Sequence, residues 1–249
     1  MALRAGASFD HLAPTYDRWR PLLAADTRRL RFMLERCPLP PRATVLEVGC
    51  GTGRLLREVA NIGQAAVAIG VDPEPAMLSA ANDVETRLGR AESLPVDGES
   101  VDLAFMSLVL HLVDDRAAAA RELYRVLRAR GSAAVWTLTP EHVVRFHLNR
   151  YFPTLPKLDL RRFEAPERWL GHLLAAGFDP VCEAEMVTVR RTTARRLAAA
   201  VRARYISTLS LLPPAEFESG VRRLEAEAAD NPQRRVTYRQ VWCLLWARK

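Results

Sequence analysis

The chain has 249 residues, of which 49% are hydrophobic and 26% are charged, a balance typical of a globular protein with one large core. No apolar run approaches the roughly 18 residues needed to cross a bilayer, so we expect a cytoplasmic protein without a membrane partner. The net charge of +7 comes almost entirely from arginines spread along the chain, which we interpret as a compositional bias that calls for no nucleic-acid partner. The four cysteines lie far apart and form no C-x-x-C pair, so we expect neither a metal site nor a disulfide framework.

The predicted elements begin with helical segments. The pattern predicts helices over 9–20 and 22–36, separated at Pro21, and a stiff proline-containing linker that leads into the first strand. We interpret residues 1–40 as a helical cap that either covers a site at the sheet edge or only stabilises the fold.

Strands and helices alternate in the next part of the chain, 41–139, which forms the predicted ligand-binding core. Such alternation implies right-handed crossovers, a parallel sheet, and ligands at the carboxyl ends of the strands. Strands are predicted over 44–48, 65–71, 84–90, 101–106 and 133–138, and helices over 54–62, from Pro75 onward, and over 115–130.

The rhythm changes after Pro140. We interpret 140–176 as a lid or insertion and 177–249 as C-terminal strands and helices that contribute to a substrate pocket, all within one domain. The expected elements are helices over 140–150, 165–176, 193–211 and 214–229, a proline-punctuated loop through Pro153 and Pro156, and strands over 181–190 and 236–247.

The most informative stretch follows the first strand, where Gly49, Gly51 and Gly53 alternate after Glu47. Glycines let the backbone bend sharply and let a ligand approach it, while the next helix offers free N–H groups. This pattern predicts a nucleotide-like cofactor. A dinucleotide fingerprint would need a glycine where Arg54 stands, so the spacing disfavours an NAD site.

Two further acids follow predicted strands: Asp72 after the second and Glu92 after the third. A strand-end carboxylate can accept hydrogen bonds from both ribose hydroxyls, although Asp72 could instead cap the helix that begins near Pro75. Because the carboxyl ends of parallel strands meet at one edge of a sheet, we expect Glu47, Asp72 and Glu92 to converge on the glycine loop.

Four segments resemble, in order, the motifs of class I S-adenosylmethionine-dependent methyltransferases of the small-molecule, type 11/25-like group. The resemblance implies a Rossmann-like α/β fold with a mostly parallel seven-stranded sheet, one antiparallel strand and helices on both faces. It also implies S-adenosyl-L-methionine as the cofactor and S-adenosyl-L-homocysteine as the product. The segments are 45–53, Val71-Asp72-Pro73 with Met77-Leu78, 91–95 and 102–111.

The same resemblance implies which residues meet the cofactor. The glycine backbone would pack against its methionine part, Asp72 would accept the ribose hydroxyls, and Ala91 and Glu92 would meet the adenine. Ser107 would lie near the methionine amino group. The full expected set is Tyr16, Arg20, Glu47, Gly49, Cys50, Gly51, Gly53, Asp72, Pro73, Met77, Ala91, Glu92 and Ser107.

A sulfonium methyl group is already activated, so the enzyme mainly aligns the nucleophile, excludes water and, where needed, removes a proton. His111, just after the fourth strand, is the candidate base; alternatively it only hydrogen-bonds the backbone at a helix start. The expected substrate pocket holds His142, Phe146, His147 and Tyr205, and the five-residue spacing of its two histidines makes a poor metal pair.

We therefore expect methyl transfer to an O, N or C atom of a small apolar or aromatic acceptor, by a monomer or homodimer. Two alternatives remain open. The net charge and paired arginines would suit an RNA methyltransferase, and a non-catalytic S-adenosylmethionine-binding module would need no base.

Overall fold

The computed structural model describes residues 12–249, so the start of the helix predicted over 9–20 lies outside the described residues. The strands are β1 (Thr44–Val48), β2 (Val67–Asp72), β3 (Glu85–Leu88), β4 (Val101–Ser107), β5 (Leu127–Leu138), β6 (Val181–Thr193) and β7 (Arg235–Arg248). The helices are η1 (Ala13–Thr15), α1 (Tyr16–Trp19), α2 (Ala24–Arg36), α3 (Arg54–Gly63), α4 (Pro75–Ser79), η2 (Leu110–Leu112), α5 (Arg116–Val126), α6 (Pro140–Val144), α7 (Leu155–Arg162), α8 (Pro166–Ala176), α9 (Ala194–Arg202), η3 (Ser207–Leu211) and α10 (Pro214–Asp230).

One seven-stranded sheet organises the molecule in the order β3-β2-β1-β4-β5-β7-β6. The first five strands in the chain pair in parallel, and β7 runs antiparallel to both of its neighbours, β5 and β6. The predicted mostly parallel sheet with one antiparallel strand is therefore confirmed. The sheet reverses its winding between β1 and β4, which places the expected ligand crevice at the carboxyl ends of these strands.

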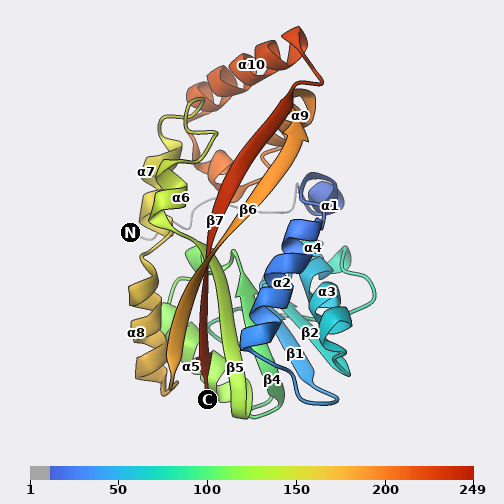
Figure 1. The fold of residues 1–249 in the computed structure, drawn as a ribbon, viewed down its shortest axis with the longest axis vertical. Coiled ribbons are helices and arrows are strands. Elements are labelled where there is room, and N and C mark those ends of the chain that lie inside the picture. Colours follow the sequence, from blue (N-terminus) through green and yellow to red (C-terminus); the bar gives the residue numbers. More distant parts are fainter. Residues whose placement is uncertain (1–11) are drawn as a thin grey trace.

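Helices cover both faces of the sheet (Figure 1). On one face, Leu30 of α2 and Leu56 of α3 are fully buried against strand residues such as Phe105. On the other face, Leu123 of α5 and Trp169 of α8 pack against the opposite side of the same strands. Within residues 12–249, no helix combines the length and apolarity needed to traverse a lipid bilayer.

Several predicted elements were wrong in extent. The helix predicted over 115–130 ends at Val126, because Leu127 pairs with Val101 of β4 and starts a strand; pairing with a neighbouring strand outweighs local helix preference here. The loop predicted through Pro156 contains α7, whose first turn holds this proline, where no backbone N–H is needed. The helix predicted over 193–211 also stops early, at Arg202.

The hairpin of β6 and β7 continues past the sheet. Strand β5 pairs with β7 only as far as Leu138 opposite Trp242, whereas β6 and β7 stay paired from Val187 opposite Val241 to Thr193 opposite Arg235. We call this two-stranded extension, residues 187–193 and 235–241, the ribbon. It rises from the sheet to α9 and α10 (Figure 1), which with α7 enclose a separate apolar core.

This upper core supplies a stability prediction. A Cβ added at Gly220 of α10 would lie 2.2 Å from Cε1 of the buried Phe152 ring, so Gly220→Ala should lower the free energy of unfolding by about 1–3 kcal/mol through overpacking. At Gly171 of α8 an added Cβ meets no atom within 4 Å. Gly171→Ala should therefore raise the free energy of unfolding by up to about 1 kcal/mol, because alanine favours a helix more than glycine does. Thermal denaturation measures both, and equal shifts in the two variants would contradict the packing argument.

Candidate active site

A cavity of about 1110 Å³ lies at the carboxyl ends of β1, β2 and β4, beneath the ribbon, with α1, α2, α7 and η3 at its sides. Ligand pockets usually span about 300–1,000 Å³, so this one has room for a cofactor and a second small molecule. Of the residues expected at the site, only Gly53 and His147 do not line it.

The three glycines of the loop adopt the backbone conformation that their alternating spacing predicts. Gly49, Gly51 and Gly53 have φ angles of 75°, 54° and 72°, in the region that favours glycine. An added Cβ at Gly49 would lie 2.2 Å from Val109, whereas at Gly51 it would meet nothing within 4 Å. The backbone at Gly51 therefore borders open space in the cavity.

Asp72 organises this loop from the end of β2. Its Oδ2 accepts a hydrogen bond from the Gly51 N–H at 2.8 Å, and its Oδ1 accepts one from the Glu74 N–H at 3.0 Å. Burial raises the pKa of Asp72, and these two backbone donors oppose the shift. Each carboxylate oxygen keeps a lone pair for a ligand.

Glu47 lies beneath the loop and is 1% exposed. Burial raises its pKa to about 8, with Arg54 opposing the shift, and Oε2 has no hydrogen-bond partner among the described residues. A carboxyl group in this state is largely protonated at neutral pH, so it can donate as well as accept a hydrogen bond at the cavity wall.

Glu92 joins two loops at the far side of the cavity. Its Oε1 accepts a hydrogen bond from the Asp114 N–H at 2.9 Å, and its Oε2 lies 3.7 Å from Nε of Arg90. Ala91 next to it is buried in the cavity lining. These contacts fix the position of the segment that the resemblance assigns to adenine.

The N-terminal helices close the cavity from the side. The Thr52 hydroxyl donates to Oδ1 of Asp17 at 2.8 Å, and Nε of Arg54 lies 3.7 Å from the same oxygen. These contacts tie α1 to the glycine loop. They bring Tyr16 and Arg20 to the cavity wall, with the Arg20 guanidinium 6.0 Å from the Tyr16 ring centroid.

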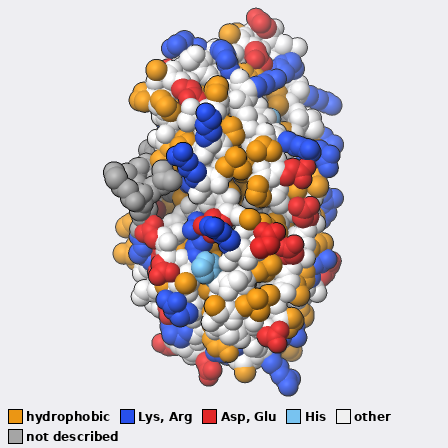
Figure 2. Space-filling view, turned by 90° about the vertical axis from the view of Figure 1, so that its left-hand side faces the viewer, with side chains coloured by type: hydrophobic (Ala, Val, Ile, Leu, Met, Phe, Trp, Pro, Cys, Tyr) orange, Lys and Arg blue, Asp and Glu red, His pale blue; other side chains and the backbone are white. Residues whose placement is uncertain are grey.

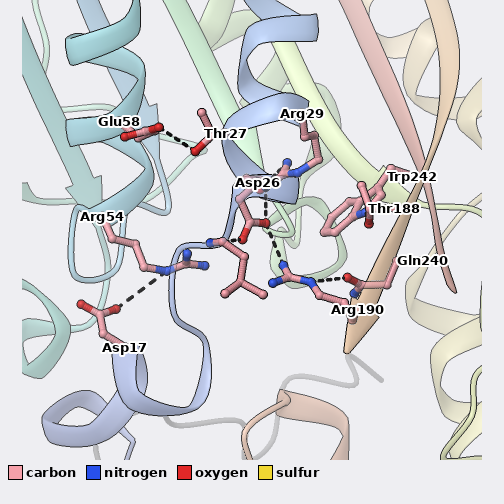
Figure 3. Close-up of polar contacts among 12 residues, drawn as sticks. Asp17, Asp26, Thr27, Arg29, Arg54, Glu58, Thr188, Arg190, Gln240 and Trp242 are labelled. Atoms are coloured by element: carbon pink, nitrogen blue, oxygen red, sulfur yellow. Dashed lines mark hydrogen bonds and ion pairs between the residues drawn. The ribbon is translucent and has the colours of Figure 1, made fainter. Parts of the chain in front are cut away.

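A buried ion network that the sequence did not predict forms another wall (Figure 3). Oδ1 of Asp26 lies 2.7 Å from Nη2 of Arg190 and 3.8 Å from Nη2 of Arg29, so two arginines share one carboxylate. Arg29 also donates to the Ser107 hydroxyl at 3.1 Å, and Arg190 donates to the side chain of Gln240 at 2.8 Å. The chain of contacts links β4 at the glycine-loop side to the ribbon.

Arg29 is the least expected member of this network because it is only 2% exposed. Its guanidinium lies 4.3 Å and 5.1 Å from the ring centroids of Trp242 and Trp136. Burial lowers the pKa of Arg29 to about 9, so the side chain remains charged at neutral pH. The aspartate three residues earlier, on the same helix face, was the sequence signal for this pair.

His111 lies in the cavity at η2, stacked on Phe163 with 4.3 Å between ring centroids. Burial lowers its pKa well below 6.5, and Arg162, Arg20 and Arg116 lower it further. Nδ1 is buried without a hydrogen-bond partner among the described residues. The imidazole is therefore neutral at physiological pH.

The other two expected histidines differ in position. His142 lines the cavity, and its Nδ1 accepts a hydrogen bond from the Val241 N–H at 3.2 Å, where the ribbon leaves β5. His147 instead stacks on Tyr238 with 3.9 Å between ring centroids. Phe146 and Tyr205 both line the cavity. No group of three His, Cys, Asp or Glu side chains within residues 12–249 is arranged to hold a metal ion.

His147→Phe should stabilise the protein. Both ring nitrogens of His147 are buried without a hydrogen-bond partner among the described residues, a defect that costs roughly 1–3 kcal/mol. Burial lowers the pKa of His147 to about 3, against about 6.5 in an unfolded chain. Between these values the unfolded state binds a proton that the native state does not, so the wild type loses stability as pH falls below about 6.5, by up to about 1.4 kcal/mol per unit.

The gain from His147→Phe should therefore grow on acidification. Urea unfolding at neutral pH and at about pH 5 measures it, with His172→Phe on the half-buried surface of α8 as the matched control, expected to stay within about 0.5 kcal/mol. A gain of the same size at both pH values would contradict the titration argument.

The arginines behind the RNA alternative have varied partners. Arg190 is paired within the cavity wall, Arg234 lies 3.1 Å from Glu227, and Arg223 donates to a backbone carbonyl. On the face shown in Figure 2, basic and acidic side chains are interspersed. That face carries no continuous basic stripe of the kind that tracks a nucleic-acid backbone.

Comparison with known proteins gives consistent matches. Residues 46–135 match the model of a methyltransferase domain family. The chain is 33% identical over 178 residues to the ubiquinone/menaquinone biosynthesis C-methyltransferase UbiE of Xanthomonas oryzae pv. oryzae, covering 63% of this chain and 69% of that protein. It is 30% identical over 245 residues to the malonyl-[acyl-carrier protein] O-methyltransferase of Halorhodospira halophila, covering 94% and 79%.

The fold has solved counterparts as well. A methyltransferase candidate from an antibiotic biosynthesis pathway of Anabaena variabilis superposes with a TM-score of 0.66 at 21% identity, covering 87% of this chain and 96% of that one. This likeness supports the predicted Rossmann-like fold class.

Proposed function

We propose that this chain, which belongs to the class I S-adenosyl-L-methionine-dependent methyltransferases, binds S-adenosyl-L-methionine in its cavity and transfers the methyl group to a small-molecule acceptor. The observation that carries the proposal is the pairing of Gly51 with Asp72. A strand-end carboxylate with free lone pairs stands beside a backbone that borders open space, as a ligand with vicinal hydroxyls and an extended tail requires.

The donor set of the cavity fits this cofactor. Gly49 and Gly51 would face its methionine part, Asp72 would accept the ribose hydroxyls, and Ser107 would lie near the amino group. When bound, the cofactor supplies a methyl group that its sulfonium already activates. The further residues proposed to contact it are Tyr16, Glu47, Cys50, Pro73, Met77, Ala91 and Glu92, all of which line the cavity.

The protein's own part in the reaction is alignment, exclusion of water and, where required, proton removal. We assign the last role to His111, which lines the cavity. Its imidazole is neutral, and Nδ1 has no hydrogen-bond partner among the described residues. A base with a lowered pKa is weak, so it suits a nucleophile whose proton is acidic, such as a phenol; a carboxylic acid is already ionised at neutral pH and would need no base.

The acceptor would occupy the part of the cavity below the ribbon. Phe146, Tyr205 and Trp242 line it there, which supports an acceptor with an apolar or aromatic part. One relative named above is a C-methyltransferase and the other an O-methyltransferase, so the atom methylated is not constant among relatives.

Two measurements test the proposal. Titration calorimetry with S-adenosylhomocysteine should give a one-to-one complex, and NADH should bind more weakly. Incubation with a panel of phenols, carboxylic acids and quinols and with methyl-labelled cofactor should then transfer label to at least one compound. Absence of binding at high micromolar S-adenosylhomocysteine would refute the cofactor assignment, and binding without transfer to any acceptor would favour a non-catalytic module.

A further inference from the structure

The two sides of the cavity differ in charge. The side formed by the strand ends carries the acids Asp72 and Glu92, and Glu47 next to them is largely protonated. The side below the ribbon carries Arg20, Arg29 and Arg190, with Asp26 as the carboxylate between them. S-adenosylmethionine has a sulfonium and an ammonium group against one carboxylate, so its net charge complements the acidic side. It leaves the excess positive charge below the ribbon unmatched.

Among the described residues, Arg20 has no carboxylate partner, and its guanidinium lies 6.0 Å from the Tyr16 ring centroid. Its side chain makes no hydrogen bond and no ion pair with any residue in the described range 12–249, and it lines the cavity. The groups that act on it electrostatically are Tyr16, Tyr205, Tyr238 and Asp26, and Asp26 is already bonded to Arg190. This half-buried guanidinium has no carboxylate of its own among the described residues, and an anionic ligand would supply one.

Two phenols stand on the same side of the cavity. Tyr238 lies opposite Arg190 in the β6–β7 register, which places both side chains on the cavity face of the ribbon. Tyr205 follows α9 and also lines the cavity. Burial raises the pKa of both phenols, so both hydroxyl groups stay protonated. The two side chains also hydrogen-bond each other, which leaves one phenol proton free to donate to a ligand.

We propose that Arg20, Tyr205 and Tyr238 form a subsite for an oxyanion, a carboxylate or a phosphate, carried by the methyl acceptor. The inference rests on the proposed function and narrows its substrate class to small acids. A planar guanidinium beside a hydrogen-bonded pair of phenols, which keeps one O–H donor free, is a set that suits such oxyanions. It gives Arg20 an acceptor-binding role in place of the cofactor contact that the family resemblance implies.

Binding of simple probes to the protein saturated with S-adenosylhomocysteine tests the subsite. Benzoate and phenyl phosphate should bind in calorimetry, and neutral benzyl alcohol should bind at least about tenfold more weakly, because it cannot pair with the guanidinium. The stronger of the two anions identifies the preferred oxyanion. Equal binding of all three probes, or binding of none, would overturn the subsite.

Variants locate the effect. Arg20→Gln should weaken binding of the preferred anion at least about tenfold while changing S-adenosylhomocysteine affinity less than about threefold. Tyr238→Phe should weaken the anion by a smaller factor. Arg239→Gln, whose exposed side chain does not line the cavity, is the matched control and should change neither affinity.

Two outcomes separate this inference from the proposed function. If Arg20→Gln weakens S-adenosylhomocysteine and leaves the anion unchanged, Arg20 holds the cofactor carboxylate and the subsite is refuted, while the methyltransferase function stands. If the wild type binds the anions but no S-adenosylhomocysteine, the subsite stands and the cofactor assignment fails; titrating the anions into the cofactor-free protein reveals this case.

Discussion

Asp72→Ala should weaken S-adenosylhomocysteine binding by at least about 100-fold. The carboxylate accepts hydrogen bonds from the Gly51 and Glu74 N–H groups and is proposed to accept the ribose hydroxyls. Hydrogen bonds to a charged group contribute about 1.5–3 kcal/mol each, and losing two of them costs more than the roughly 2.7 kcal/mol that a 100-fold change requires. Titration calorimetry measures the effect directly.

A matched pair of variants shows whether the effect is local. Asp72→Asn retains one carbonyl acceptor but places an NH₂ group against a backbone N–H, so its loss should be intermediate. Asp97→Ala, at an exposed position outside the cavity lining, should leave the affinity unchanged. A loss below about tenfold in Asp72→Ala would show that this carboxylate is not a principal contact of the cofactor.

Asp26→Asn should lower the free energy of unfolding by about 3–5 kcal/mol, the usual cost of removing one partner from a buried ion pair. Asp26 is 2% exposed, and its carboxylate serves Arg190, Arg29 and the Leu23 N–H. Asparagine keeps the shape but leaves two guanidinium groups in the wall without a compensating charge. Urea unfolding of the wild type and the variant gives the difference.

The control lies on the same helix. Glu35 is paired with Arg36 at 3.6 Å, but its side chain is 71% exposed. Glu35→Gln should therefore change stability by less than about 1 kcal/mol, as for surface ion pairs in general. If Asp26→Asn lowered the free energy of unfolding no more than Glu35→Gln does, Asp26 would not be needed to compensate the charges of Arg29 and Arg190.

The sequence was most informative where its signals were local. The alternation of Gly49, Gly51 and Gly53 after a β-branched run located β1, the turn and α3. The position of Asp72 at the end of the second predicted strand placed it at the same sheet edge as the glycine loop. The antiparallel strand came with the family resemblance and is confirmed. The roles assigned to the individual site residues and the division into cap, core and lid remain predictions.

The features that the sequence did not predict depend on contacts between segments that are distant in the chain. Asp26 and Arg190 are 164 residues apart in the chain, and no periodicity connects them. Leu127 reads as the continuation of a helix until Val101 is available beside it as a strand partner. Both cases show a tertiary contact determining what the local pattern left open.

The ribbon begins where β5 stops pairing, at Leu138 opposite Trp242. Two-stranded ribbons twist more strongly than wider sheets, so the hairpin leaves the plane of the sheet at that point and turns over the strand ends. The length of β5 therefore sets how far above the strand ends the ribbon begins, and with it the height of the cavity. Extending the pairing by two residues would raise the point of departure by about 6.6 Å, so acceptors of different length can be accommodated by changing one strand end while the glycine loop stays untouched.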